Sequence, residues 1–226
     1  MTLIACSHGT RFQEGRDAIH DLIAHVRQLL PGVEIAEAFV DVQEPSIDHV
    51  VAGTDGPAVI VPLLLSAGFH TGVDIARAAR IRDDVTATAP LGPHPLLAET
   101  LVARLHEAGL RDGDHIVLAA AGSSRPAAAE HVERMRELLA ILLPHPVTVG
   151  YAAGADPQIP AAVAAARASG ARRVVAASYV LAPGYFANEV AGAGADVATA
   201  PLGADPRVAQ VIAERYLSAI PALTAA

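Results

Sequence analysis

Two histidines and an aspartate each follow a segment that is expected to form a strand. His8 follows the run 3–7, and Asp41 follows the run 33–40. His70 comes a few residues after a third such run. A neutral imidazole can accept a proton near pH 7 and can bind a divalent metal. Two imidazoles and a carboxylate suit first-row ions such as Fe²⁺, Co²⁺, Ni²⁺ and Zn²⁺. These residue types therefore predict a metal-handling site.

The order of the elements indicates how the three side chains would meet. Helical periodicity separates the strand-like runs of the first half. The helices expected there are 16–30, 45–51, 71–82 and 95–108. Strands separated by helices form parallel sheets with right-handed crossovers, and ligands bind beyond the carboxyl ends of such strands. We therefore expect His8, Asp41 and His70 at one edge of one parallel sheet.

The second half of the chain repeats the first. In this repeat His8 falls opposite Ala121, and His70 falls opposite Tyr185. The fold class expected is α/β, with two similar lobes that each hold a parallel sheet flanked by helices. Because the second copy lacks the histidine pair, we expect it to be a degenerate, supporting half.

The repeat also predicts where the lobes begin and end. We expect an N-terminal lobe over 1–110, which carries the active-site histidines, and a C-terminal lobe over 114–226. The glycine-containing, charged segment 109–114 is the expected joint. In the second lobe the final helix is expected over 206–219, and the segment 185–191 is expected to be irregular.

The bulk composition excludes several classes of protein. The net charge is −8 and every cation is arginine, which disfavours a nucleic-acid binder. No apolar run reaches the roughly 18 residues of a membrane span, and the start lacks the basic region of a secretory signal. The single cysteine rules out an internal disulfide and fits a cytoplasmic protein. No glycine-rich nucleotide motif occurs.

Three motifs of the first half resemble one known family. They are the segments 7–11 (SHGTR), 38–47 (AFVDVQEPSI) and 62–70 (PLLLSAGFH). The first is weakly specific alone, but the third is much more specific when it follows the first. The chain resembles the sirohydrochlorin chelatases, the small cobalt- and iron-chelatases related to ferrochelatase (class II chelatases), in a duplicated two-lobe form.

The resemblance implies a fold, a reaction and roles for individual residues. The family has two similar α/β lobes with a cleft between them. It inserts Fe²⁺ or Co²⁺, and in some members Ni²⁺, into sirohydrochlorin on the routes to sirohaem and cobalamin. The metal is then a substrate, and no permanently bound cofactor is expected. His8 and His70 match the family's metal-handling histidines. Asp41 stands where the family usually has glutamate, so its direct coordination of the metal stays open.

A tetrapyrrole with many carboxylates needs local cations on this acidic chain. Arginine can bind a carboxylate through a forked pair of hydrogen bonds. The candidate substrate-binding residues are Ser7, Arg11, Arg77, Arg125 and Tyr185. For Arg77, a solvated helix face is an equally good interpretation.

Three alternatives remain on sequence grounds. The first is a metal or tetrapyrrole carrier that uses the same residues without turnover. The second is a phosphoryl-transfer enzyme of the histidine phosphatase type, although that class has an arginine where Ser7 precedes His8. In the third, the duplication is purely architectural. A monomer without membrane or nucleic-acid partners is the simplest expectation, because a fused duplication already supplies two lobes.

Overall fold

The computed structural model describes residues 1–68 and 71–224. The chain forms two compact units. Unit 1 comprises Met1–Leu91 and Ala204–Ala226, and unit 2 comprises Gly92–Gly203. Each unit contains one parallel four-stranded sheet with helices on both faces, which confirms the expected α/β class.

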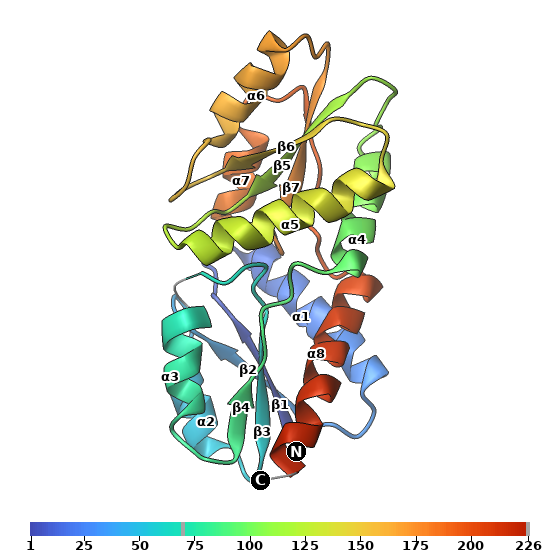
Figure 1. Ribbon diagram of the computed structural model, residues 1–226. Helices are drawn as coiled ribbons and strands as arrows, with labels where there is room; N and C mark the ends of the chain where they lie inside the picture. Colours follow the sequence, from blue (N-terminus) through green and yellow to red (C-terminus); the bar gives the residue numbers. More distant parts are fainter. Residues whose placement is uncertain (69–70, 225–226) are drawn as a thin grey trace. The chain divides into compact units, whose positions relative to one another are not determined.

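The sheet of unit 1 has the strand order β2-β1-β3-β4 (Figure 1). Its strands are β1 (Thr2–Ser7), β2 (Ile35–Phe39), β3 (Ala58–Pro62) and β4 (Val85–Ala87). In β1, every residue is buried, as expected for a central strand covered on both faces. All pairings are parallel, so β1, β2 and β3 end at the same edge of the sheet.

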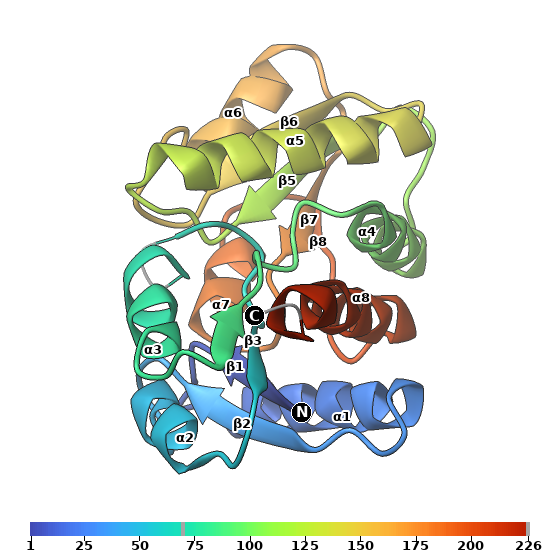
Figure 2. The same ribbon diagram turned by 60° about the horizontal axis from the view of Figure 1, so that its bottom comes forward.

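Helices cover both faces of this sheet (Figures 1 and 2). One face is covered by α1 (Gln13–Leu29) and α8 (Pro206–Thr224), and the other by α2 (Ile47–Gly53) and α3 (Ala76–Ala79). Side chains alternate along β1, so that Ile4 and Cys6 pack in the apolar cluster formed with α2 and α3. Among the described residues, no helix is both long and apolar enough to cross a membrane.

The helix expected over 71–82 is present, but its first turn has a different type and its end comes earlier. It begins as a π-helical segment, η1 (Thr71–Ile75), continues as α3 and ends at Ala79. Periodicity alone does not separate a π-helical turn from an α-helical one, because both place apolar residues toward the sheet. Short π-helical segments are frequent at functional sites.

Unit 2 repeats the same topology, with the strand order β6-β5-β7-β8 (Figure 2). Its strands are β5 (His115–Ala120), β6 (Val147–Tyr151), β7 (Val174–Tyr179) and β8 (Val197–Ala198). Its helices are α4 (Pro95–Glu107), α5 (Pro126–Leu142), α6 (Ile159–Ala168) and α7 (Tyr185–Ala191). The segment expected to be irregular is therefore helix α7.

The compact units differ from the expected lobes 1–110 and 114–226 by their last helices. Helix α4 packs on α5 and β7 and belongs to unit 2, whereas α8 packs on α1 and β3 and belongs to unit 1. The expected joint 109–114 is thus a turn inside unit 2. There Arg173 donates to the Gly109 carbonyl over 3.1 Å and pairs with Asp114 over 2.5 Å.

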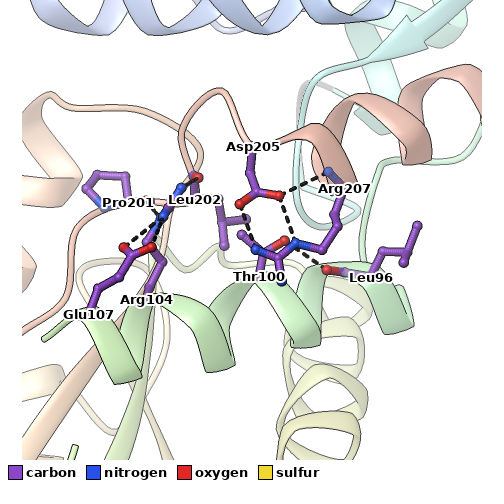
Figure 3. A network of polar contacts seen from close by, with 8 residues as sticks. All are labelled: Leu96, Thr100, Arg104, Glu107, Pro201, Leu202, Asp205 and Arg207. Carbon is purple, nitrogen blue, oxygen red and sulfur yellow. Dashed lines mark hydrogen bonds and ion pairs between the residues drawn. The ribbon is translucent and has the colours of Figure 1, made fainter. Parts of the chain in front are cut away.

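A matching arginine fixes each of these helices to its own unit. In unit 1, Arg215 on α8 donates to the carbonyl oxygens of Pro90 and Leu91 over 3.1 and 3.2 Å. In unit 2, Arg104 on α4 donates to the carbonyl oxygens of Pro201 and Leu202 over 3.1 and 2.9 Å (Figure 3). The acceptors belong to the repeated sequence Ala-Pro-Leu-Gly that follows the last strand of each unit.

Candidate functional site

His8 lies in the loop directly after β1. Ser7 ends the strand and is only 5% exposed, whereas His8 is half-buried. The Nδ1 atom of His8 lies 3.3 Å from the Gly9 carbonyl oxygen. Gly9 has φ +89°, and a Cβ at this position would overlap the carbonyl oxygen of Asp41. Only glycine fits the backbone here, so the loop after β1 closes tightly on the loop after β2.

Hydrogen bonds join these two loops. Asp41 N–H donates to the His8 carbonyl over 3.2 Å. Thr10 N–H donates to the Gln43 side-chain oxygen over 2.7 Å. His8 and Asp41 therefore lie on adjoining loops at the carboxyl edge of the sheet, as the order of elements predicts. Gln43 was not among the expected residues, because nothing in the sequence marks a side chain that holds a distant backbone amide.

The Asp41 carboxylate is exposed at this edge. Its Oδ1 atom accepts a hydrogen bond from Val42 N–H over 2.8 Å. This bond fixes the orientation of the carboxylate and leaves further acceptor capacity on its two oxygens. A hollow of about 370 Å³ adjoins it. The hollow is lined by Phe39, Val40, Asp41, Val42, Gln43, Glu44 and Ser46.

His70 lies outside the described residues, so its position relative to His8 stays a prediction. The segment that leads to it is anchored at the same edge, since Leu63 N–H donates to the Cys6 carbonyl over 2.8 Å. Among the described residues, no three His, Cys, Asp or Glu side chains form a group that could hold a metal ion. The expected ligand set of His8, His70 and Asp41 stays a prediction as well.

Cys6 is the remaining group at this edge with nucleophilic potential. Burial, together with the nearby Asp74 carboxylate, raises the pKa of its thiol to about 12. A thiol with that pKa stays protonated near neutral pH, and the thiolate is the reactive form. Cys6 therefore serves as a small apolar residue of the core.

The expected substrate-binding residues of unit 1 differ in how accessible they are. Arg11 is exposed in the loop after His8. Arg77 is 60% exposed, but its Nη2 atom pairs with Asp48 over 3.0 Å and lies 3.9 Å from Asp74. This ion pair joins α3 to α2, so the Arg77 guanidinium already has a carboxylate partner. Ser7 presents little side-chain surface.

Two expected residues belong to unit 2. Arg125 is half-buried, and its backbone N–H donates to the Ser123 hydroxyl just before α5. Tyr185 is 60% exposed at the start of α7, and its ring meets Phe186 edge to face at a centroid distance of 5.3 Å. Both residues follow strands of the second sheet, as their counterparts in the repeat do in the first.

The fold and site define a duplicated α/β protein whose histidine and carboxylate gather at the carboxyl edge of its first sheet. The CbiX family model matches the chain twice, over residues 2–108 and 115–219. The chain therefore belongs to the CbiX family, in a form with two copies. The two matched ranges are those of the sequence repeat rather than those of the compact units.

Two curated relatives are proteins called sirohydrochlorin cobaltochelatase. The protein from Methanococcoides burtonii is 25% identical over 123 residues, which cover 46% of this chain and 94% of the relative. The protein from Methanosarcina acetivorans is 24% identical over 123 residues, covering 47% of this chain and 95% of the relative. Each relative thus corresponds to about half of this chain.

Solved structures share the whole fold. SirB from Bacillus subtilis with Fe³⁺ superposes with a TM-score of 0.79 at 18% identity, covering 100% of this chain and 98% of that one. A structure of CbiX, described as the terminal enzyme of sirohaem biosynthesis in denitrifying bacteria, gives 0.71 at 21% identity and covers 97% and 99%. These similarities confirm the expected two-copy chelatase-like fold.

Proposed function

We propose that this chain is a sirohydrochlorin chelatase that inserts a divalent metal ion, Fe²⁺ or Co²⁺, into a sirohydrochlorin-type tetrapyrrole. The observation that carries the proposal is the double match to the CbiX family, whose curated relatives are called sirohydrochlorin cobaltochelatases. The metal ion and the macrocycle are both substrates. The same family membership disfavours the phosphoryl-transfer alternative.

The reaction requires acceptors for two protons. The free macrocycle carries two inner N–H groups, and both protons leave as the divalent ion binds the four nitrogens and sheds its water. His8 is half-buried beside the exposed Asp41 loop, where its imidazole can accept one proton. We assign proton transfer and metal delivery to His8 and His70 together, with Asp41 as the accompanying carboxylate. Held in fixed positions, these groups replace the random encounter of two solutes.

Arginines supply the charge that a polyanionic macrocycle needs. We assign Arg11 and Arg125 to its carboxylates, because both follow the first strand of their sheet and each can form a forked ion pair. Tyr185 is an exposed residue whose hydroxyl can form a further hydrogen bond. Arg77 is the weaker assignment, since binding substrate there competes with its ion pair to Asp48.

An anaerobic metallation assay tests the proposal. Purified protein is mixed with sirohydrochlorin and Co²⁺, and the absorption spectrum is followed against a control without protein. We expect multiple turnovers per chain and a rate proportional to protein concentration. A rate equal to the control would overturn the proposal. Binding of the macrocycle at one equivalent without turnover would identify a carrier instead. Repeating the assay with Fe²⁺ and Ni²⁺ ranks the metals.

We also propose that the protein acts as a monomer. The curated relatives correspond to about half of this chain, so the duplication already supplies two copies of their fold. Light scattering coupled to gel filtration should give the mass of one chain, 23.2 kDa. A dimer mass at micromolar concentration would contradict this.

A further inference from the structure

Val42 adopts a backbone conformation that valine ordinarily avoids. Its φ is +63°, and it is the one non-glycine residue with a positive φ in the part of the chain that the structure describes. It stands at the centre of a tight turn in which Gln43 N–H donates to the Asp41 carbonyl over 2.6 Å. A β-branched residue with positive φ is a genuine outlier, and the strain amounts to about 1–2 kcal/mol.

Unit 2 has a glycine with a positive φ at the equivalent position. The bridges that close the two loops, Phe39 with Ser46 and Tyr151 with Gln158, place Gly154 opposite Val42. The φ of Gly154 is +69°, close to that of Val42. The positive φ therefore belongs to the shared scaffold, and glycine is the residue that such a φ favours. The valine in unit 1 needs a reason other than the backbone.

Packing does not supply that reason. Val42 is 42% exposed, and it lines the hollow at the carboxyl edge of the sheet. A Cβ built on Gly9 would lie 3.3 Å from the Val42 Cβ, so the valine side chain adjoins the loop that carries His8. An exposed apolar group held in a strained turn beside the site points to a role in contact with a ligand.

The charge of the hollow narrows the kind of ligand group that fits. Besides Val42, its lining includes the exposed carboxylates of Asp41 and Glu44. These would repel the carboxylates at the rim of a tetrapyrrole and attract a divalent cation. The apolar part of such a substrate is the flat face of the ring. The apolar side chain in this acidic lining therefore matches the face of the ring, and the carboxylates match a metal ion rather than the anionic rim.

From these observations we propose that Val42 is a substrate-contacting residue whose side chain packs against the face of the macrocycle and sets its height above the Asp41 carboxylate. The inference rests on the proposed function and extends it to a residue of this chain. Valine, unlike glycine, provides two methyl groups whose burial against the ring favours binding.

Two substitutions distinguish a role of Val42 in binding the substrate from a role in stabilising the fold. Val42→Asn introduces a side chain of similar size that tolerates a positive φ, and Val42→Gly introduces the residue that unit 2 has at this position. We expect both variants to melt at or above the wild-type temperature, because strain is relieved. We also expect the Kd for metal-free sirohydrochlorin, followed by absorption, and the KM in Co²⁺ insertion to rise about tenfold, as loss of buried apolar contact implies. Val42→Leu, which restores an apolar group, should recover most of the affinity.

Ile81 provides the matched control. It is 45% exposed in the same unit, but it lies between α3 and β4, near the amino ends of the strands and not at their carboxyl ends. Ile81→Ala should leave Kd and KM unchanged. The inference fails if wild-type protein metallates sirohydrochlorin while Val42→Asn and Val42→Gly bind it as tightly as wild type. If wild-type protein neither binds nor metallates the macrocycle, the proposed function itself has failed.

Discussion

Gly9 and Gly122 adopt almost the same left-handed conformation, with φ of +89° and +86°, each just beyond the first strand of its unit. A Cβ on either would overlap a carbonyl oxygen of the neighbouring loop, that of Asp41 in unit 1 and that of Ala153 in unit 2. The backbone of the two loop pairs is therefore shared. The residue before the glycine is His8 in one unit and Ala121 in the other.

The comparison separates what the fold requires from what the chemistry requires. Unit 2 keeps the glycine after its first strand and a positive φ at Gly154, but it has alanine where unit 1 has His8 and Asp41. The duplicated scaffold thus carries the groups that we propose to be reactive in one copy only. Exchanging or removing residues at equivalent positions tests this asymmetry directly.

The largest expected effect comes from the histidines. Replacing His8 or His70 by alanine should lower kcat/KM for metal insertion by roughly 10² to 10⁴, the range for loss of a positioned general acid or base. The melting temperature should change little, because His8 is not part of the buried core. The anaerobic absorption assay measures the rate, and circular dichroism monitors the fold.

Unit 2 offers a matched control for these variants. Ala121→His places an imidazole at the position opposite His8, and it should neither raise the wild-type rate nor rescue His8→Ala. A His8→Ala protein that metallates at the wild-type rate would show that the asymmetry between the units has no catalytic meaning.

Replacing Gly9 or Gly122 by alanine tests the same difference between unit 1 and unit 2. Gly9→Ala and Gly122→Ala should each lower the free energy of unfolding by about 1–3 kcal/mol, because both force an L-residue into positive φ against a carbonyl. Urea unfolding measures this loss. Only Gly9→Ala should also slow metallation per folded molecule, assayed well below the melting temperature, because it shifts the loops that carry His8 and Asp41. An equal decrease in the metallation rate of both variants would show that both units take part in the reaction.

Local sequence patterns predicted most of the strands and helices and the neighbouring positions of His8 and Asp41. The first run, 3–7, became β1 with one residue added, and the helix expected over 95–108 coincides with α4 to within one residue. The adjoining positions of His8 and Asp41 followed from parallel pairing, since strands that end at one edge bring their following residues together. Each of these features depends on patterns within a few residues or on topology rules.

The features that sequence reasoning missed depend on contacts between distant residues. A repeat shows that two segments are alike, but it does not show whether α4 packs in the first unit or the second. The ion pair of Arg77 with Asp48 likewise joins helices far apart in sequence. The strain at Val42 was detectable in principle, because aligning the repeats places it opposite Gly154.

Substituting Arg104 on α4 and Arg215 on α8 tests whether the two helices are stabilised in the same way, each within its own unit. Arg215→Met and Arg104→Met should each lower the free energy of unfolding by about 1–3 kcal/mol, because partly buried carbonyl oxygens lose charged donors. Lysine at either position should restore only part of this, since it lacks the forked guanidinium. Thermal melting measures both series. A loss confined to one variant would show that the two helices are held differently.

The smallest expected effect concerns a titratable residue that only unit 2 has. His115 begins β5 at the position where Thr2 begins β1, and its Nε2 atom lies 3.0 Å from the Thr148 hydroxyl. Burial lowers the pKa of His115 below its usual value of 6.5. The unfolded chain therefore binds a proton at this residue before the folded chain does as the pH falls.

The sign of the pH dependence follows from this difference. The contribution of His115 to stability is fully present above pH 6.5 and is lost as the pH falls from there toward the lowered pKa of the folded state. The slope can reach at most one proton, about 1.4 kcal/mol per pH unit. His115→Thr, which copies unit 1, should flatten the dependence of the urea unfolding free energy between pH 7.5 and 5, whereas Thr2→Ser should leave it as in wild type. Parallel curves for wild type and His115→Thr would show that His115 is as easily protonated in the folded chain as in the unfolded one.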